Sequence, residues 1–293
     1  MRENGRDMVP NRAAFFPSLY VASSLDDALA ALAERGVEGS PFAGGTWIMR
    51  APLRHERPGR AYVGLGRVAE LSRIEKEDGH IRLGTGVTHA HLAESLRDLP
   101  DMQVLAEAAG RSANPAVRRM ATLGGNLCTA SFSAADLVPA LLCLDAEVDI
   151  ASPAGVERLP LERFLARRPS LEAGRLLTSV RIPRSLGRSA HARLPLRKAG
   201  DYPTAIVSLS VEREAAGRVT KARVAVGAVE AVARRWPRLE AALIGAPLDA
   251  ASAHRAATEL AGEFHGRDGI DAPGWYRISV LPTLVRRAVA ALH

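Results

Sequence analysis

The sequence of 293 residues is poor in cysteine, lysine and aromatic residues, and it has no long hydrophobic run. Its longest apolar segment, Leu137 to Leu144, is far shorter than the roughly 18 residues that span a membrane. The N-terminal segment MRENGRDMVPNR is charged and lacks an apolar core, so we expect no secretory signal and a cytoplasmic location. Cys128 and Cys143 could pair, although a reducing compartment explains two cysteines equally well.

The basic charge of the chain comes almost wholly from arginine. Lys+Arg number 39 and Asp+Glu 32, a formal net charge of +7, yet lysine occurs only at Lys76, Lys198 and Lys221. Basic residues form short pairs such as Arg118–Arg119, and aromatic residues make up only 4% of the chain, too few for base-stacking platforms. We therefore expect a solvated, arginine-rich surface and no nucleic-acid partner.

Several motifs of catalysis and nucleotide binding are missing. The sequence has no G-x-x-x-x-G-K-[ST], no G-x-G-x-x-G at a strand–helix junction, no H-E-x-x-H and no G-x-S-x-G. Gly84-Thr85-Gly86 is predicted to be a turn before a strand. His89 and His91 are two residues apart, so they do not share one helix face and are not expected to bind a metal together. Surface or capping roles are favoured, and a place in a cofactor pocket stays open for one of them. Two cysteines cannot hold an iron–sulfur cluster.

Periodicity and turn signals predict a mixed α+β chain in two parts. In the first part, a short strand is predicted to break at the paired glycines within residues 41–46, and further strands are predicted over 61–65, 81–83, 146–151 and 176–182. Helices are predicted over 25–33, 88–96, 102–109 and 137–144. The small and polar segment 184–190 predicts a boundary between domains spanning residues 1–184 and 190–293. In the second part, a hairpin of strands over 204–212 and 218–229 precedes helices over 239–244, 250–261 and 281–292.

Two glycine pairs with polar neighbours are the strongest candidates for a binding site. They lie in Ala43-Gly44-Gly45-Thr46 and in Thr122-Leu123-Gly124-Gly125-Asn126. Glycine permits positive φ and close approach of a ligand to the backbone. Successive N–H groups in such a turn can hold phosphate oxygens, and Thr and Asn add uncharged donors. Two such loops could grip a diphosphate from opposite sides, although each alone is more often a plain tight turn.

Four ordered segments resemble one known family, the FAD-binding medium subunit of molybdenum-containing hydroxylases. They read PFAGGTWIM, VRRMATLGGNLCTASFSAADLVPALL, LRKAGDYPTA and GWYRISVLPTLVRRAV. The family includes the medium subunit of aerobic carbon monoxide dehydrogenase and the flavin portion of xanthine dehydrogenase. The resemblance covers nearly the whole chain, from about Pro17 to Val289.

The resemblance implies an α+β fold: a two-part FAD-binding domain of the vanillyl-alcohol oxidase type, then a small C-terminal domain of antiparallel sheet and helices. It implies that residues 43–46 and 122–126 wrap the FAD pyrophosphate, that Leu127 and Cys128 lie near the flavin ring, and that Tyr202 covers its face. The cofactor-binding residues expected on this basis are Phe42, Ala43, Gly44, Gly45, Thr46, Trp47, Ile48, Thr122, Leu123, Gly124, Gly125, Asn126, Cys128, Asp136, Leu177, Lys198, Asp201 and Tyr202.

Three of these assignments stay open. Asp136 could hydrogen-bond the cofactor or only cap the following helix, and Cys128 could be a plain small core residue. Many relatives carry a lysine at the start of the strand before the Gly-Asp-aromatic motif, where this sequence has Arg193 nearby and Lys198 close to the motif. Either basic residue could contact the cofactor.

The family also implies a role and partners. The chain would hold non-covalent FAD, since no motif points to a covalent link, and it would hold no metal. It would accept electrons from two [2Fe–2S] clusters in a small subunit, after substrate is hydroxylated at a molybdopterin centre in a large subunit, and pass them to an external acceptor. We expect a dimer of heterotrimers. The alternatives are a stand-alone flavin oxidoreductase and a scaffold subunit that has lost FAD.

Overall fold

The computed structural model describes residues 18–56, 59, 61–197 and 201–292. It begins with a parallel three-stranded sheet in the order β1-β3-β2. Its strands are β1 (Ser18–Val21), β2 (Gly39–Phe42) and β3 (Ala61–Gly64). The helix α1 (Leu25–Arg35) packs beside this sheet; the side chain of Ser24 caps it, and Gly36 ends it at a φ of 52°. The 3-10 helices η2 (Gly36–Glu38) and η3 (Ile48–Arg54) follow α1 and β2.

An antiparallel sheet in the order β4-β5-β8-β6-β7 completes the N-terminal module, residues 18–183. Its strands are β4 (Ile74–Glu77), β5 (His80–Gly84), β6 (Glu147–Ser152), β7 (Gly155–Pro160) and β8 (Leu176–Pro183). Its helices are α2 (His89–Ser95), α3 (Gln103–Arg111), α4 (Pro115–Met120), α5 (Leu123–Cys128), α6 (Leu137–Cys143) and α7 (Leu161–Arg167), with the 3-10 helices η4 (Ala69–Ser72), η5 (Pro100–Met102) and η6 (Arg168–Ser170). An extensive apolar core lies between sheet and helices.

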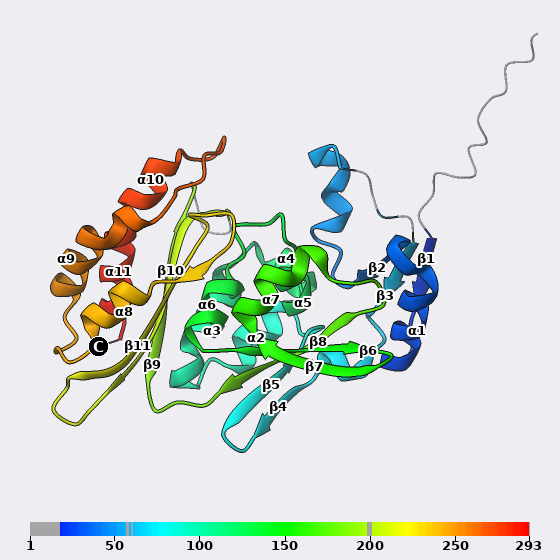
Figure 1. Ribbon diagram of the computed structural model, residues 1–293, viewed down its shortest axis with the longest axis horizontal. Helices are drawn as coiled ribbons and strands as arrows, with labels where there is room; N and C mark the ends of the chain where they lie inside the picture. The colour runs from blue at the N-terminus through cyan, green and yellow to red at the C-terminus, as the bar shows by residue number, and fades with distance from the viewer. Residues whose placement is uncertain (1–17, 57–58, 60, 198–200, 293) are drawn as a thin grey trace, which may run out of the picture.

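The C-terminal module, residues 188–292, is an antiparallel sheet in the order β12-β11-β10-β9 with helices on its outer face (Figure 1). Its elements are β9 (Arg188–Pro195), β10 (Pro203–Arg213), β11 (Val219–Gly227), β12 (Arg234–Arg235), α8 (Pro237–Leu243), α9 (Ala250–Leu260), η7 (Ala261–Glu263), α10 (Gly274–Ser279) and α11 (Leu281–Ala290). Helices α3 and α6 pack on the inner face, so they are sandwiched between two sheets. The two modules therefore share a buried interface.

Most predicted elements are found within one or two residues of their expected ends. The hairpin of β10 and β11, the capped helices α1 and α2, and the α+β class are all confirmed. Two expectations are wrong. Gly84-Thr85-Gly86 follows strand β5 and leads into a helix, because β5 ends at Gly84. Gly124 and Gly125 lie inside helix α5, where neither has a positive φ.

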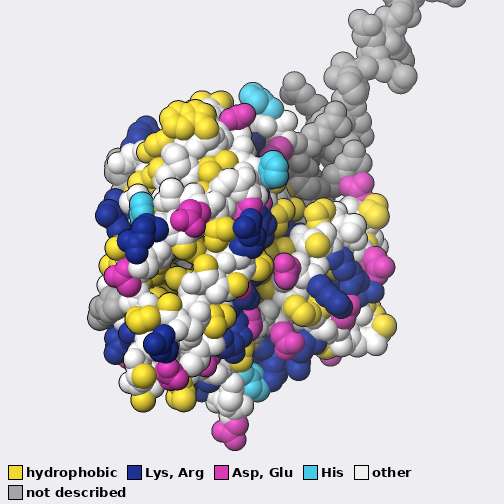
Figure 2. Space-filling model, turned by 60° about the vertical axis from the view of Figure 1, so that its left-hand side comes forward, with side chains coloured by type: hydrophobic (Ala, Val, Ile, Leu, Met, Phe, Trp, Pro, Cys, Tyr) yellow, Lys and Arg dark blue, Asp and Glu magenta, His cyan; other side chains and the backbone are white. Residues whose placement is uncertain are grey.

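The segment predicted to join the domains is more ordered than its composition indicates. Arg184 donates to the buried Asp101 carboxylate, with Nε 2.5 Å from Oδ2, and strand β9 begins at Arg188. In the described part of the chain, none of the helices has the length and apolar character needed to cross a bilayer. Both cysteines are unpaired. On the face drawn in Figure 2, basic and acidic side chains of the described residues are interspersed.

A fully buried arginine ties α10 to the rest of the C-terminal module. The Arg277 side chain is 0% exposed. It donates to the carbonyl oxygens of Thr204 at 2.8 Å and Arg267 at 3.0 Å, and to the Asp271 carboxylate at 2.6 Å. One guanidinium therefore joins α10 to strand β10 and to the loop that precedes α10.

We predict that Arg277→Met destabilises the protein by about 3–5 kcal/mol, because the Thr204 and Arg267 carbonyls and the Asp271 carboxylate each lose a short bond to a buried guanidinium. Urea unfolding of the two proteins measures the difference. Arg286→Lys, on the exposed side of α11, is the matched control and should change stability by about 0.5 kcal/mol or less. Equal stabilities of Arg277→Met and wild type would contradict this role for Arg277.

Candidate cofactor site

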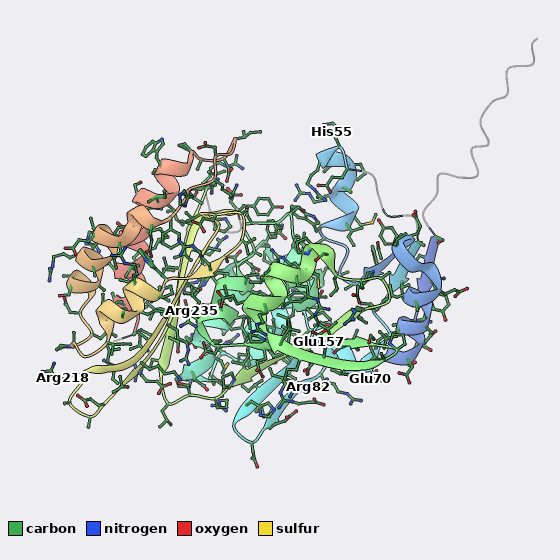
Figure 3. All side chains as sticks on the ribbon, viewed as in Figure 1. His55, Glu70, Arg82, Glu157, Arg218 and Arg235 are labelled. Carbon is green, nitrogen blue, oxygen red and sulfur yellow. The ribbon has the colours of Figure 1, made fainter. Side chains whose placement is uncertain are left out.

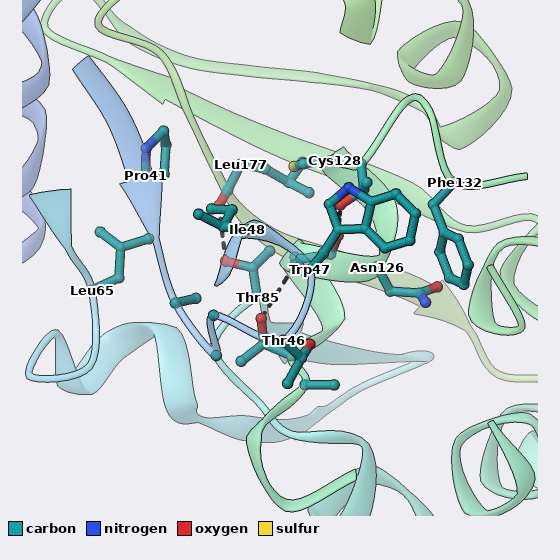
Figure 4. A pocket seen from close by; sticks show the side chains of 18 of the residues that line it. Pro41, Thr46, Trp47, Ile48, Leu65, Thr85, Asn126, Cys128, Phe132 and Leu177 are labelled. Atoms are coloured by element: carbon teal, nitrogen blue, oxygen red, sulfur yellow. Dashed lines mark hydrogen bonds between the residues drawn. The ribbon is translucent and has the colours of Figure 1, made fainter. Parts of the chain in front are cut away.

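One cavity of about 700 Å³ gathers most of the residues expected at the cofactor site. It lies between β2, the N-terminal end of α5 and strand β8, and it reaches the β9–β10 turn of the C-terminal module. The expected residues that line it are Ala43, Gly44, Gly45, Thr46, Trp47, Ile48, Thr122, Gly124, Gly125, Asn126, Cys128, Asp136, Leu177 and Tyr202. Figure 4 shows several of them facing the same space. Segments far apart in sequence thus form one concave surface.

The first glycine pair makes a tight turn with unused backbone donors. A Cβ at Gly44 would lie 1.7 Å from the carbonyl oxygen of Met120, so only glycine fits there. Gly45 has a φ of 69°, which other L-residues rarely adopt. Among the described residues, the backbone N–H groups of residues 44–47 meet no acceptor. Because this turn lines the cavity, a bound ligand can supply the acceptors that these donors need.

The second glycine pair serves a different purpose. Its N–H groups are already bonded within the chain: Leu123 to Val87 O at 2.9 Å, Gly124 to Thr85 O at 2.8 Å and Gly125 to Thr122 Oγ1 at 3.2 Å. A Cβ at Gly124 would come within 2.8 Å of the Thr85 Cβ, so glycine is required for packing. The expectation that the first turn of α5 offers a second set of free backbone amides is therefore wrong.

Side chains supply the polar groups at this second wall. Asn126 accepts a 3.3 Å hydrogen bond from Leu137 N through Oδ1, which leaves its side-chain NH₂ group free to donate. Thr122 Oγ1 accepts from Gly125 N, so its hydroxyl proton is also free. Thr85, which sequence reasoning dismissed, lines the cavity and donates to Leu177 O at 2.8 Å (Figure 4). This bond fixes β8 against the strand–helix turn.

Three aromatic rings from separate segments meet at one end of the cavity. The centroid of Trp47 lies 4.7 Å from that of Phe132, which lies 5.2 Å from that of Tyr202. Arg50, on η3, donates to the Tyr202 hydroxyl at 3.2 Å and links the N-terminal module to the C-terminal one. η3 projects from the body of the molecule and is followed by His55 (Figure 3). Flat apolar surfaces of this kind suit a planar ring.

Asp136 lies at the cavity wall and pairs with a cation of the other module. Its carboxylate is 2% exposed and accepts from Arg193 Nε at 2.7 Å. Its side chain makes no capping bond to α6, so the capping alternative is not supported. Arg193 itself does not line the cavity. Of the two basic residues left open by the sequence, Arg193 thus has a defined partner, whereas Lys198 lies outside the described residues.

His89 and Cys128 are weakly polar groups of the cavity wall. Burial lowers the pKa of His89 to about 4, although the Asp136 carboxylate acts in the opposite direction. Its Nδ1 lies 2.7 Å from Ser112 Oγ, and its Nε2 has no partner among the described residues. Cys128 opens onto the cavity, yet the surrounding protein raises the pKa of its thiol to about 12. Both side chains are therefore neutral at pH 7.

Some expected residues lie beside the cavity instead of lining it. Phe42 packs edge-on against Tyr62 at 5.5 Å, Leu123 and Leu127 belong to the core, and Asp201 pairs with Arg197 at 3.2 Å. Sequence reasoning missed several lining residues, including Arg50, Thr85, Gly86, Ser112, Phe132, Glu172 and Arg175. The Gly84-Thr85-Gly86 turn was the available signal for two of them. Loop residues such as Phe132 carry no motif of their own.

The chemistry of the cavity fits an elongated dinucleotide with a flat ring. Free backbone amides at residues 44–47, with Asn126 and Thr122, suit its anionic middle, and the aromatic cluster suits the ring. Arg50 also lines the cavity, whereas the charge of Arg175 is balanced by its ion pairs with Glu172 and Glu157. In the described residues, no cluster of three or more His, Cys, Asp or Glu side chains is arranged to hold a metal ion.

Comparison with known families accounts for nearly all of the chain. Residues 13–185 match the model of the FAD binding domain in molybdopterin dehydrogenase. Residues 191–292 match the model of the CO dehydrogenase flavoprotein C-terminal domain.

Curated relatives match over almost their full length. The 6-hydroxypseudooxynicotine dehydrogenase complex subunit alpha of Paenarthrobacter nicotinovorans is 33% identical over 93% of both chains. The xanthine dehydrogenase FAD-binding subunit of Escherichia coli O157:H7 is 28% identical over 94% of this chain and 95% of the relative. The carbon monoxide dehydrogenase medium chain of Afipia carboxidovorans is 28% identical over 91% and 93%.

Solved structures show the same fold. A chain of quinoline 2-oxidoreductase from Pseudomonas putida 86 superposes with a TM-score of 0.85 at 27% identity, covering 94% of this chain and 96% of that chain. A chain of reconstituted CO dehydrogenase from Oligotropha carboxidovorans gives a TM-score of 0.85 at 24% identity, covering 94% and 98%. The latter likeness supports the fold alone.

We predict that Gly44→Ala weakens FAD binding at least about tenfold, equivalent to about 1.4 kcal/mol. The new Cβ would collide with the Met120 carbonyl and displace the turn that carries the free amides. Titration of flavin-free protein with FAD measures the affinity. Gly110→Ala is the control, since its Cβ would meet only Ala93 Cβ, at an ordinary 3.5 Å. Unchanged affinity in Gly44→Ala would show that the turn does not bind FAD.

We also predict a pH dependence of stability from His89. Its pKa falls from 6.5 in the unfolded chain to about 4 in the folded one, so the unfolded chain binds more protons between these values. The contribution of His89 is therefore complete above pH 6.5 and is lost as pH falls to 4, by about 3 kcal/mol in total. His89→Gln should flatten this part of the stability profile, measured by urea unfolding at each pH.

The exposed neighbour supplies the control for that profile. His91→Gln lies on the same helix and should keep the slope of the wild type. If the unfolding free energies of wild type and His89→Gln fall equally between pH 6.5 and 4, the pKa of His89 is not lowered by folding.

Proposed function

Because this chain belongs to the FAD-binding subunits of molybdenum hydroxylases, an oxidoreductase family, we propose that it serves as the electron-transfer subunit of such a complex. It binds FAD, as the matched FAD-binding domain and its relatives do. In the proposed role it accepts electrons from [2Fe–2S] clusters of a partner subunit and passes them to an external acceptor. The proposed domain limits are residues 1–184 for FAD binding and 190–293 for the C-terminal domain.

The observation that carries the proposal is the convergence of both modules on one cavity. The glycine turn at 44–47 offers free amide donors, and Tyr202 of the C-terminal module lines the same space. Bound FAD supplies the redox chemistry, since flavins exchange electrons singly or in pairs. The chain itself supplies binding, orientation and a defined environment.

The polar and the aromatic residues of the cavity would contact different parts of FAD. The amides of 44–47 and the Asn126 side chain would hold the pyrophosphate. Trp47, Phe132 and Tyr202 would cover the ring and exclude water from it. Asp136 would accept a hydrogen bond from the cofactor through the oxygen that Arg193 Nε does not use. No residue in this set needs to move a proton to or from a substrate.

The chemistry on a substrate would take place in other subunits. The relatives are named as a complex subunit, an FAD-binding subunit and a medium chain. We propose a molybdopterin-containing large subunit and a [2Fe–2S] small subunit as partners, in a dimer of heterotrimers. We propose that the FAD is non-covalent, since no sequence motif points to a covalent link. A cytoplasmic location stays a prediction.

The test uses the complex purified from cells that express this chain with its genomic neighbours. We predict that anaerobic addition of the substrate of the complex bleaches the flavin absorbance, because electrons arrive from the clusters of the partner. The flavin-loaded chain alone, given the same substrate, should keep its oxidised spectrum. This comparison also separates the proposal from a stand-alone flavin oxidoreductase.

Two results would overturn the proposal. Substrate oxidation by the isolated chain would support the stand-alone alternative. A complex that turns over while its flavin absorbance is missing would mean that the chain only holds the assembly together.

A further inference from the structure

A single buried guanidinium bridges two modules: it binds Asp136 at the cavity wall and the backbone of Asp201, the residue before Tyr202. The side chain of Arg193, on β9, is 5% exposed. Its Nε donates to Asp136 Oδ1 at 2.7 Å, and its Nη2 donates to the carbonyl oxygen of Asp201 at 2.7 Å. Both bonds are short and charge-assisted, and the rigid fork of arginine fixes their relative direction.

The first bond gives the buried Asp136 carboxylate its charged partner. This carboxylate lies at the start of α6, where its side chain is only 3% exposed. The other nearby candidate, His191 Nε2, lies 3.7 Å from Asp136 Oδ1, too far for a hydrogen bond. Arg193 is therefore the direct counter-charge of a buried carboxylate that faces the cavity, and without it this charge would be uncompensated.

The second bond holds the turn that carries Tyr202. Asp201 immediately precedes Tyr202, and the carbonyl of Tyr202 accepts a 3.1 Å bond from Leu196 N across the β9–β10 turn. Tyr202 is 44% exposed, so burial alone does not fix its ring. Its position depends on the backbone of the turn, which Arg193 binds from inside, and on the Arg50 contact at the rim.

We propose that Arg193 is a positioning residue of the flavin site that sets the Asp136 carboxylate and the Tyr202 ring relative to each other. It acts from behind the cavity wall, since it does not line the cavity. A lysine at this position could make one of the two bonds but lacks the fork needed for both. The inference rests on the proposed contacts of Asp136 and Tyr202 with FAD.

The test measures FAD release and the visible circular dichroism of bound flavin in the purified FAD-containing protein. Arg193→Met should speed FAD release roughly tenfold or more, the effect of losing charge-assisted bonds. It should also change the flavin circular dichroism, because the ring environment loses its fixed geometry. Arg193→Lys should release FAD more slowly than Arg193→Met, but it should not regain the wild-type circular dichroism.

The matched control is Arg197→Met. Arg197 binds the same Asp201, but through the carboxylate at 3.2 Å and with a side chain that is 77% exposed. We expect FAD release and dichroism in this variant to stay within about twofold of wild type, as for other exposed ion pairs.

Double variants separate positioning from general destabilisation. If Arg193 acts through Asp136 and Tyr202, the effects of Asp136→Asn and Tyr202→Ala on FAD release should be smaller in the Arg193→Met background than in wild type. The Asp136→Asn/Arg193→Met protein also serves if Arg193→Met alone does not fold, since it removes both buried charges. It should keep the faster FAD release of Asp136→Asn with little further change.

The outcomes distinguish this inference from the proposed function. A wild-type protein that never holds FAD would defeat the proposed function itself. If wild type holds FAD and Asp136→Asn or Tyr202→Ala speeds its release, while Arg193→Met matches Arg197→Met, only the role of Arg193 is wrong. Fully additive effects in the double variants would likewise reject it.

Discussion

The cavity depends on one close backbone approach, between Gly44 and the carbonyl of Met120. A Cβ at Gly44 would lie 1.7 Å from that oxygen, so the turn after β2 and the segment before α5 can meet only because this side chain is missing. That contact places the free amides of residues 44–47 opposite Asn126 and Thr122. The backbone donors that the site offers to a pyrophosphate therefore depend on the absence of a side chain at Gly44.

The two glycine pairs look alike in sequence, but glycine is required in them for different structural reasons. Gly45 is needed for its positive φ, Gly44 for contact with another backbone, and Gly124 for contact with Thr85. Only the first pair leaves its amides free. The φ angle is partly local, whereas the two contacts arise from tertiary structure. Sequence reasoning could therefore locate both segments but could not say which one presents backbone donors.

The same distinction explains how much of the fold was predictable. The side chains of Ser24, Thr88 and Thr122 cap the N-terminal ends of helices α1, α2 and α5. Such signals are local, and the first two helices were found from sequence. Periodicity did not locate strand β9, whose first three residues fall in the segment 184–190 that was taken as a linker. The strand is buried because it pairs with β10 and packs on α3, which are contacts that a local pattern does not contain. The partnership of Asp136 with Arg193, 57 residues apart, is equally invisible to local patterns.

The cavity combines two ends that respond differently to relative movement of the modules. The glycine turn, Asn126 and Thr122 all belong to the N-terminal module, so the grip on the pyrophosphate is internal to it. The aromatic end instead combines Trp47 and Phe132 with Tyr202 of the other module, joined by Arg50 and Arg193. A small shift between modules would therefore alter the cover of the ring while leaving the pyrophosphate contacts intact. A change at the module boundary therefore acts on FAD through its ring, whereas a change at Gly44 acts through the pyrophosphate.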